Sequence, residues 1–243
     1  MNKLITFIKG FIMFNILWYV MALIINMQVL PNPLEVYKNI GNLFDQDFFK
    51  HILMSMYRVL LGLGVSLLIG IPIGILMSYS EKWNKILNPF VYFSYPIPKT
   101  ALLPVVMLLL GLGDSSKIVL IVLIVVFQVI VTVRDSITKI SQEIYVPLRS
   151  LGASKSQILM HVTLPAILPD LFTNLRLSVG TALSVLFFSE AYGTHYGIGY
   201  YILDAWTRID YISMYAGIMI ISLIGCLLFI LIDALQTKLC RWN

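Results

Sequence analysis

Long stretches without charged side chains dominate this sequence and limit what it can fold into. Apolar runs of about the length that crosses a bilayer occur at 11–30, 59–77, 86–112, 118–133, 176–192 and 211–232. Only 12% of the 243 residues are charged, against about 25% in a soluble domain. Most of the surface must therefore face lipid, where helices satisfy their own backbone groups. The sequence predicts an all-α membrane protein with about six transmembrane helices.

The first apolar run is the least regular, because Asn15, Asn26 and Gln28 interrupt it. Lys3 and Lys9 precede it, as in a secretory signal peptide, but no small-x-small cleavage site follows. We expect an uncleaved membrane anchor.

The distribution of Lys and Arg predicts how the chain is oriented. With six spans and the N-terminus inside, the cytoplasmic segments are 1–10, 80–88, 134–175 and 235–243. They hold ten Lys or Arg residues, whereas the outer segments hold four, and this bias is typical of cytoplasmic loops. We expect a multi-pass protein of the plasma (inner) membrane with a cytoplasmic N-terminus. The net charge of +5 thus reflects topology, and no basic soluble face indicates nucleic-acid binding.

Metal and disulfide chemistry have no support in the sequence. His51, His161 and His195 are isolated from one another, and a metal site needs clustered ligands. Cys226 and Cys240 are 14 residues apart, which on one helix is about 21 Å and too far for a disulfide. We expect no metal and no cofactor.

Small residues recur every four positions in the second run. They are Gly62, Ser66, Gly70, Gly74 and Ser78. This spacing lines one helix face with small side chains and lets a second backbone approach closely. The pattern predicts tight packing against another helix.

Three prolines interrupt the third run. Pro96, Pro98 and Pro104 surround Lys99, and an unbroken helix cannot hold them, because each lacks an N–H group and clashes with the preceding turn. Broken backbone at membrane depth is tolerated only against protein or a water-filled cavity. The segment either lines a translocation path or forms a bend at the membrane edge.

Ionisable residues inside or beside the runs are costly in lipid and must face a cavity, a partner or the head groups. Arg58 and Arg176 lie at the ends of predicted spans, where long side chains can reach the head groups. Glu190 suits either a gate or ion pair, or simple placement at the interface. The candidate path residues are Arg58, Pro96, Pro98, Lys99, Thr181, Ser184 and Glu190.

The longest polar stretch is 134–175, on the predicted cytoplasmic side. Within it, Ser154 is followed three residues later by Gln157, the spacing of a capping box that starts a helix. Gly152, just upstream, suits the left-handed conformation that closes a preceding helix. We expect a helix, a glycine turn and then a second, short helix.

An apolar face is predicted on this short helix. Ile158, Leu159 and Val162 fall on one side of it, and the helix should end before Pro165. An apolar face on the cytoplasmic side has to be buried, either on the bilayer surface or against a partner protein.

The same stretch resembles the cytoplasmic loop, called the EAA motif, of ABC importer permeases. The residues that carry the resemblance are Leu151-Gly-Ala-Ser154, Val162-Thr-Leu-Pro-Ala166, Pro169 and Leu175-Arg176. Elsewhere the chain is similar to permeases of the nitrate/sulfonate/taurine type, from about residue 50 to 235. Those motifs are Ser55-Met-Tyr-Arg58, Pro96-Ile-Pro98, Gly111-Leu-Gly113 with Lys117, Glu190, and Gly197-Ile-Gly-Tyr200.

The resemblance implies a type I ABC importer-like fold, with a coupling helix between the fourth and fifth spans. It implies an N-terminal helix and outer loop at 1–50, a permease domain at 51–243, and an ATPase-docking loop at 134–175. The implied docking residues are Leu151, Gly152, Ala153, Ser154, Gln157, Ile158, Val162 and Pro165. The implied partners are two ABC ATPase subunits, a second permease chain, most simply a homodimer, and an extracytoplasmic solute-binding protein.

One departure from the family pattern concerns the start of the loop. The Glu-Ala-Ala of the motif would fall at Val146-Pro147-Leu148, so its acidic residue is missing. Glu143, three residues upstream, is the alternative carboxylate. The resemblance therefore carries no contact of the family's glutamate over to this chain.

The expected function is that of a non-catalytic subunit. The chain has no G-x-x-x-x-G-K-[ST], so it cannot hold nucleotide phosphates in a P-loop of its own, and a partner must hydrolyse ATP. The alternative is a self-contained secondary carrier or channel, which would need inverted repeats that we do not see. A membrane-embedded enzyme would need clustered acids or nucleophiles. The substrate stays open among sulfonates, nitrate, bicarbonate and a vitamin precursor.

Overall fold

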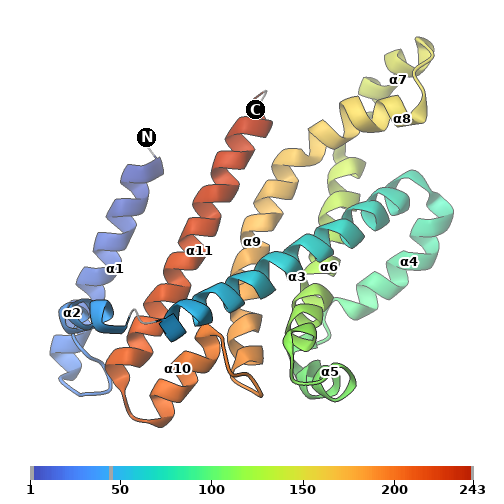
Figure 1. The fold of residues 1–243 in the computed structure, drawn as a ribbon. Helices are drawn as coiled ribbons and strands as arrows, with labels where there is room; N and C mark the ends of the chain where they lie inside the picture. Colours follow the sequence, from blue (N-terminus) through green and yellow to red (C-terminus); the bar gives the residue numbers. More distant parts are fainter. Residues whose placement is uncertain (1–2, 44–45, 242–243) are drawn as a thin grey trace.

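The computed structural model describes residues 3–43 and 46–241, and every regular element in those ranges is helical. Five helices are long and apolar enough to cross a membrane, and a bent helix pair can supply a sixth span. The long helices are α1 (Lys3–Ile25), α3 (Gln46–Tyr79), α6 (Asp114–Lys139), α9 (Leu164–Glu190) and α11 (Tyr211–Leu239). The predicted all-α architecture with about six spans is confirmed (Figure 1).

The third predicted span is broken, as its prolines indicated. It consists of α4 (Glu81–Ser94), a 3-10 turn η1 (Lys99–Leu102) and α5 (Leu103–Leu110), and the two halves are bent by 83°. Pro96 and Pro98 lie in the non-helical connection. Pro104, by contrast, lies in the first turn of α5, where a missing N–H group costs nothing.

Helices α3 and α6 pack closely along the stripe of small residues. The α3 residues in this contact are Gly62, Gly70 and Gly74, and the α6 side chains opposite them are Ile121, Val129 and Val133. A Cβ atom at Gly74 would lie 2.7 Å from Val133 Cβ, closer than real Cβ contacts allow. The predicted role of the stripe in helix packing is confirmed.

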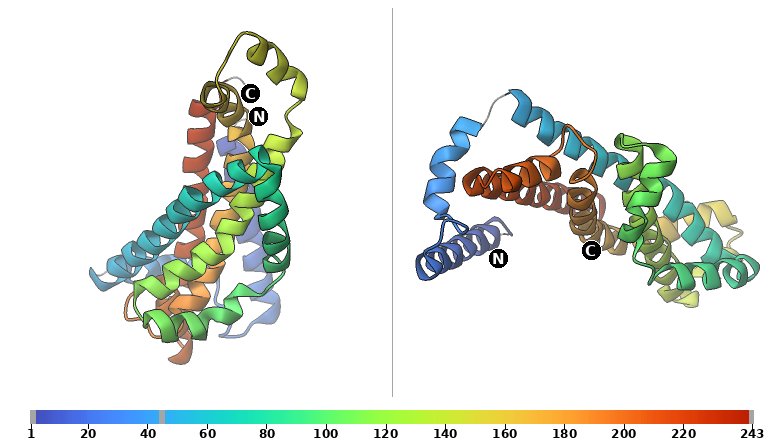
Figure 2. Two further views of the ribbon diagram at one scale, coloured as in Figure 1. Left: turned by 90° about the vertical axis from the view of Figure 1, so that its right-hand side faces the viewer. Right: turned by 90° about the horizontal axis from the view of Figure 1, so that it is seen from below.

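The main apolar core lies between α3, α6, α9 and α11. Helices α1 and α2 (Pro33–Leu43) lie at one edge of the molecule, and α4 and α5 lie at the other (Figure 2). Helix α1 is attached through Trp18 and Ala22, which cluster with Val36 and Ala216. The rest of its apolar surface is largely exposed, which suits a helix that faces lipid.

The two ends of the molecule carry different elements (Figure 1). At one end lie α7 (Gln142–Ser150) and α8 (Lys155–Ile158), together with the start of α1 and the end of α11. At the other lie α2, α5 and α10 (Ile198–Thr207). We call these the α8 end and the α10 end. The α8 end gathers segments that the Lys and Arg pattern predicts to be cytoplasmic.

The polar stretch 134–175 is far less of a loop than its composition suggests. Only 140–141 and 151–154 lie outside helices. The prediction that the short helix ends before Pro165 is wrong, because the chain continues through a π-helical turn η2 (Leu159–Thr163) directly into α9. The wider turn interrupts the regular hydrogen-bond ladder, and Pro165 falls in the first turn of α9, where its ring is tolerated.

Candidate docking helix and translocation path

The junction between α7 and α8 is built from two complementary helix caps. The backbone N–H of Gln157 donates to Ser154 Oγ at 3.3 Å, and that of Ser154 donates to Gln157 Oε1 at 2.8 Å. Gly152 has φ +80°, the left-handed conformation predicted for it. The N–H groups of Gly152 and Ala153 close α7 by donating to carbonyls three and five residues back, at 3.0 Å each, the Schellman pattern. The turn is thus held at both ends.

A cleft of about 390 Å³ opens at this junction. Its lining is Leu148, Leu151, Gly152, Ala153, Gln157, Ile158, His161 and Val162. Six of the eight predicted docking residues therefore meet at one place. Of the other two, Ser154 caps α8, and Pro165 lies in the first turn of α9.

The apolar face predicted on the short helix is partly wrong. Ile158 is buried, because α7 folds back over this region: Tyr145 Oη and Thr163 Oγ1 lie 3.2 Å apart. The exposed apolar side chains point elsewhere, and the most exposed is Leu151 at 85%. Others at this end are Ile144, Val146 and Met160. The apolar surface is therefore present but is carried mainly by α7 and the turn.

Glu143, the alternative to the missing acidic residue, lies in the first turn of α7. Its backbone N–H donates to Ser141 Oγ at 3.3 Å. A carboxylate in a first turn stabilises the helix dipole. Glu143 does not line the cleft, whereas Val146 is exposed on α7.

Replacing Ser154 with alanine should loosen α8. The change removes the side-chain cap, which costs about 1 kcal/mol, so the amide hydrogens of Gln157 and Ile158, which both bond to Ser154, should exchange about fivefold faster. Hydrogen exchange followed by mass spectrometry measures this. Ser156→Ala, an exposed change in the same helix, is the control. Equal exchange in both variants would show that the cap does not hold the helix.

A buried polar cluster lies at the α10 end of the molecule. Arg58 is 3% exposed and Glu190 is 0% exposed, and Arg58 Nη1 lies 2.5 Å from Glu190 Oε1. Arg58 Nη2 lies 2.6 Å from Asp114 Oδ1. Ser55 Oγ donates to the Glu190 carboxylate at 2.8 Å, and the N–H of Gly199 donates to it at 2.9 Å. These five residues, which we call the Arg58 cluster, join α3, α6, α9 and α10.

The expectation that Arg58 reaches the head groups is therefore wrong. The residue lies in the first half of α3, but the first residue of α6 and the last of α9 supply carboxylates on either side of it. For Glu190 the ion-pair alternative holds. Arg176 is less buried and pairs with Asp233, and it also donates to Gln236 Oε1 at 2.9 Å.

Two cavities lie along the broken span. The first, which we call the Lys99 cavity, has a volume of about 260 Å³ and is lined by Tyr95, Ile97, Lys99, Thr100, Ile124, Gln128, Thr181 and Val185. The second, the Pro96 cavity, has a volume of about 400 Å³ and is lined by Asn88, Val91, Tyr92, Tyr95, Pro96, Val131 and Arg134. Tyr95 contributes to both, so the two cavities adjoin.

The predicted path residues fall into separate places. Lys99 and Thr181, from different spans, share the first cavity, and Pro96 lines the second. Pro98 is the residue before η1. Ser184 is exposed on α9, one turn beyond Thr181. Arg58 and Glu190 line neither cavity and belong to the buried cluster.

Several site residues were missed by sequence reasoning. Ser55 is three residues from Arg58, so the two share a helix face, and this spacing is a usable signal. Gly199 lies in the Gly197-Ile-Gly-Tyr200 motif, although its contact with Glu190 was not predicted. Asp114 and Gln128 gave no signal, because each meets its partners through contacts distant in the sequence.

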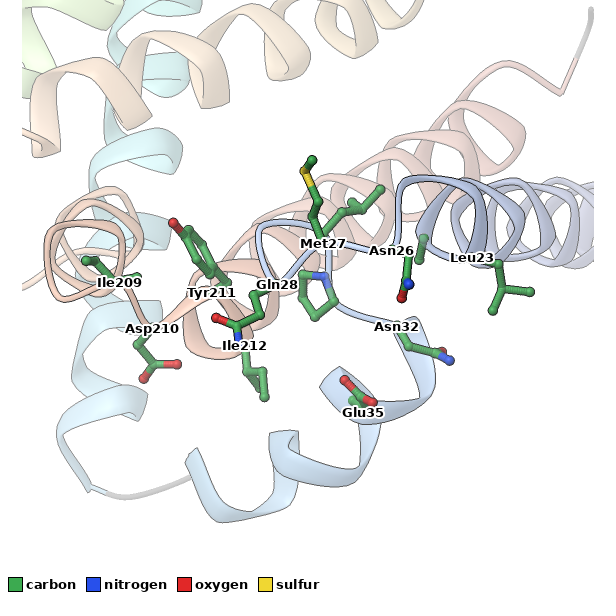
Figure 3. A pocket seen from close by; sticks show the side chains of 13 residues that line it. Leu23, Asn26, Met27, Gln28, Asn32, Glu35, Ile209, Asp210, Tyr211 and Ile212 are labelled. Atoms are coloured by element: carbon green, nitrogen blue, oxygen red, sulfur yellow. The ribbon is translucent and has the colours of Figure 1, made fainter.

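A further cavity, about 640 Å³, lies at the α10 end between α1, α2 and the turn before α11 (Figure 3). Its polar lining includes Asn26, Gln28, Glu35 and Asp210. Asp210 caps α11 by accepting from the N–H of Ser213 at 3.1 Å. That carboxylate is therefore engaged in holding the helix start.

The chain has apolar spans, a broken span beside a charged cavity, and a capped helix beyond the ends of the spans. These features are typical of a membrane transport permease. The chain belongs to the family described as binding-protein-dependent transport system inner membrane component, whose profile matches residues 66–241. It is accordingly a permease subunit of an ABC importer and an inner-membrane protein.

Curated relatives extend over nearly the whole chain. It is 31% identical to the taurine transport system permease protein TauC of Escherichia coli (strain K12), over 96% of this chain and 87% of that protein. It is 29% identical to the formylaminopyrimidine transport permease protein ThiX of Halalkalibacterium halodurans, over 96% and 94%. It is 30% identical to the bicarbonate transport system permease protein CmpB of Synechococcus elongatus, over 82% and 70%.

Solved structures share the fold. A chain of the MetNI methionine ABC transporter in an inward-facing conformation matches with TM-score 0.66 at 19% identity, over 79% of this chain and 95% of that one. A chain of a bacterial alginate ABC transporter, solved with an alginate-bound periplasmic protein, matches with TM-score 0.59 at 18% identity, over 97% and 95%.

Proposed function

We propose that this permease forms the import path for a small solute and docks onto separate ABC ATPase subunits through residues 151–165. The observation that carries the docking proposal is the cleft at the α7–α8 junction. Its walls are fixed by the Ser154–Gln157 box and the Gly152 turn, and the exposed Leu151 lies at its edge. A rigid, capped surface with an exposed apolar side chain suits a partner protein.

Force would pass from the docking surface into the membrane through the backbone. Helices α8, η2 and α9 follow one another without a loop from Lys155 to Glu190. A push by the ATPases at α8 would therefore move α9 directly. Since the chain carries no P-loop sequence, ATP hydrolysis belongs to the partner subunits.

The remaining partners complete an importer. We place two ATPase subunits, a second copy of this chain and an extracytoplasmic solute-binding protein around it. The family description names dependence on a binding protein, and the alginate transporter was solved with a periplasmic protein. The α8 end and the N-terminus would lie in the cytoplasm. The chain would divide into an N-terminal helix and outer loop at 1–50 and a permease domain at 51–243, with the docking loop at 134–175.

The path itself would pass the Lys99 and Pro96 cavities. Thr181 and Ser184 would line it from α9, while Pro96 and Pro98 would hold the broken backbone open beside it. Arg58 and Glu190 would act at its outer end by holding the spans together.

The docking assignment is tested by crosslinking in the intact complex. In a background with both native cysteines changed to serine, Lys155→Cys should crosslink to a cysteine placed in the docking cleft of the ATPase. Lys238→Cys, exposed at the same end of the molecule but on α11, should not. ATP-dependent uptake confirms that the complex is active. If an active complex never crosslinks at Lys155, the docking assignment fails.

A further inference from the structure

The ammonium group of Lys99 lies beside the middle of α6. Its Nζ is 4.9 Å from the ring centre of Phe127, and Phe127 is midway along α6, which runs from Asp114 to Lys139. At 1.5 Å per residue, each end of α6 is about 18–20 Å away. Since α6 is long and apolar enough to cross a membrane, a charge beside its middle is costly and marks a functional site by default.

The charge of Lys99 is not balanced by an acid. Among the residues that the structure describes, no carboxylate forms an ion pair with Lys99, whereas Arg58 and Arg176 both have one. Lys99 Nζ donates to the carbonyl oxygens of Ser94 and Tyr95, at 2.7 and 3.1 Å. These two bonds close the end of α4. An ammonium group has three N–H donors, so the third has no oxygen acceptor within the described part of the chain; near it lie only the faces of the Phe127 and Tyr95 rings, at 4.9 and 5.9 Å from Nζ.

Further donor capacity faces Lys99 across the same cavity. The Oε1 atom of Gln128 accepts from Ser178 Oγ at 3.1 Å, which leaves the amide Nε2 without a hydrogen-bond partner within the described part of the chain. Thr181, one turn beyond Ser178 on α9, lines the opposite wall. A full positive charge with an amide donor beside it favours a group with several acceptor oxygens and a negative charge.

We propose that the Lys99 cavity is a binding subsite for a small oxoanion, such as a sulfonate or bicarbonate group, at the centre of the import path. Lys99 supplies the charge, and Gln128 supplies the second donor. A volume of about 260 Å³ holds such a group but not a large ligand. The inference rests on the proposed import function and adds to it a place and a charge for the solute.

The charge of the cavity can be measured without knowing the solute. In the assembled transporter, with Cys226 and Cys240 changed to serine, Thr181→Cys serves as a reporter in the cavity wall. The probes are the anionic sulfonatoethyl methanethiosulfonate and its cationic trimethylammonioethyl analogue. The anionic reagent should react faster, and Lys99→Gln should lower the ratio of the two rates by about tenfold or more. Lys99→Arg should keep the ratio.

The matched control is Lys85→Gln, since Lys85 is exposed, pairs with Glu81 and lines neither cavity. It should leave the ratio unchanged. A second measurement needs no change at Lys99: ethanesulfonate should protect the reporter thiol from both reagents, and uncharged dimethyl sulfone at equal concentration should not. Any one of three results would overturn the proposal. These are a rate ratio that is unchanged in Lys99→Gln, a reporter thiol that reacts with neither reagent, and a lack of protection by ethanesulfonate.

The two proposals fail in different ways. If Lys155→Cys crosslinks to the ATPase and uptake is intact, but the rate ratio does not depend on Lys99, the anion subsite is wrong and the import function stands. If the crosslink and ATP-dependent uptake are both absent, the import function fails, and the rate ratio still reports the charge of the cavity.

Discussion

Replacing Arg58 with methionine should lower the free energy of unfolding of this permease by about 3–5 kcal/mol, the cost of breaking a buried ion pair. The change leaves the carboxylate of Glu190, which is 0% exposed, without the cation that pairs with it directly. Ser55 and Gly199 still donate to it, but neutral donors replace only part of the lost interaction. Denaturant unfolding of the purified chain in nanodiscs measures the loss.

Two variants separate this effect from the simple loss of a surface charge. Lys85→Met breaks an ion pair whose side chains are 74% and 81% exposed, so it should cost no more than about 1 kcal/mol. Adding Glu190→Gln to Arg58→Met should recover part of the stability, because the remaining partner, Asp114, is 38% exposed and can be hydrated. If Arg58→Met is as stable as Lys85→Met, the cluster is not a stabilising element.

The second large effect concerns the contact between α3 and α6. Changing Gly70 and Gly74 together to alanine should destabilise the chain by about 2–6 kcal/mol, from about 1–3 kcal/mol of overpacking at each site. The added Cβ atoms would lie 2.8 Å from Val129 Cβ and 2.7 Å from Val133 Cβ. Both valines are branched at the contact and cannot turn away. The same unfolding assay in nanodiscs measures the change.

Gly64 offers a matched control on the same helix. No atom outside its own helix lies within 4 Å of a Cβ placed there. Gly64→Ala should therefore be neutral or stabilise the chain by up to about 1 kcal/mol, through helix propensity alone. If the double variant behaves like Gly64→Ala, the two helices can separate without cost and the stripe does not set their distance.

Much of the fold could be predicted because bilayer physics acts on local sequence. Runs such as 118–133 must become helices, since nothing else satisfies the backbone in lipid, and the helix observed there is α6. The small-residue stripe correctly predicted which face of α3 packs closely against another helix, which is α6. The sequence could not show that α6 and α9 extend well past their apolar runs, because polar residues form helix equally well once a span has nucleated it.

The candidate sites follow the same rule: features set by neighbouring residues could be predicted, and features set by distant residues could not. The capping box at Ser154 and the turn at Gly152 depend on neighbours in sequence, so both were predicted. The Arg58 cluster depends on residues from four helices, and one sequence does not indicate which charges meet. Lys99 gave a signal because a lysine between prolines is unusual in an apolar run. Its neighbour Gln128 did not.

The helical run from Lys155 to Glu190 is 36 residues long, and it changes direction between α8 and α9, where the π-helical turn η2 lies (Figure 1). One of its ends is the capped α8 and the other is the acid of the Arg58 cluster. If this run moves as one rigid body about its middle, its two ends move in opposite directions. In the proposed orientation, closing the path at the α8 end would then be the same motion as opening it at the α10 end. Under the proposed import function, the two ends of the path would open and close together, because one helical run contributes to both.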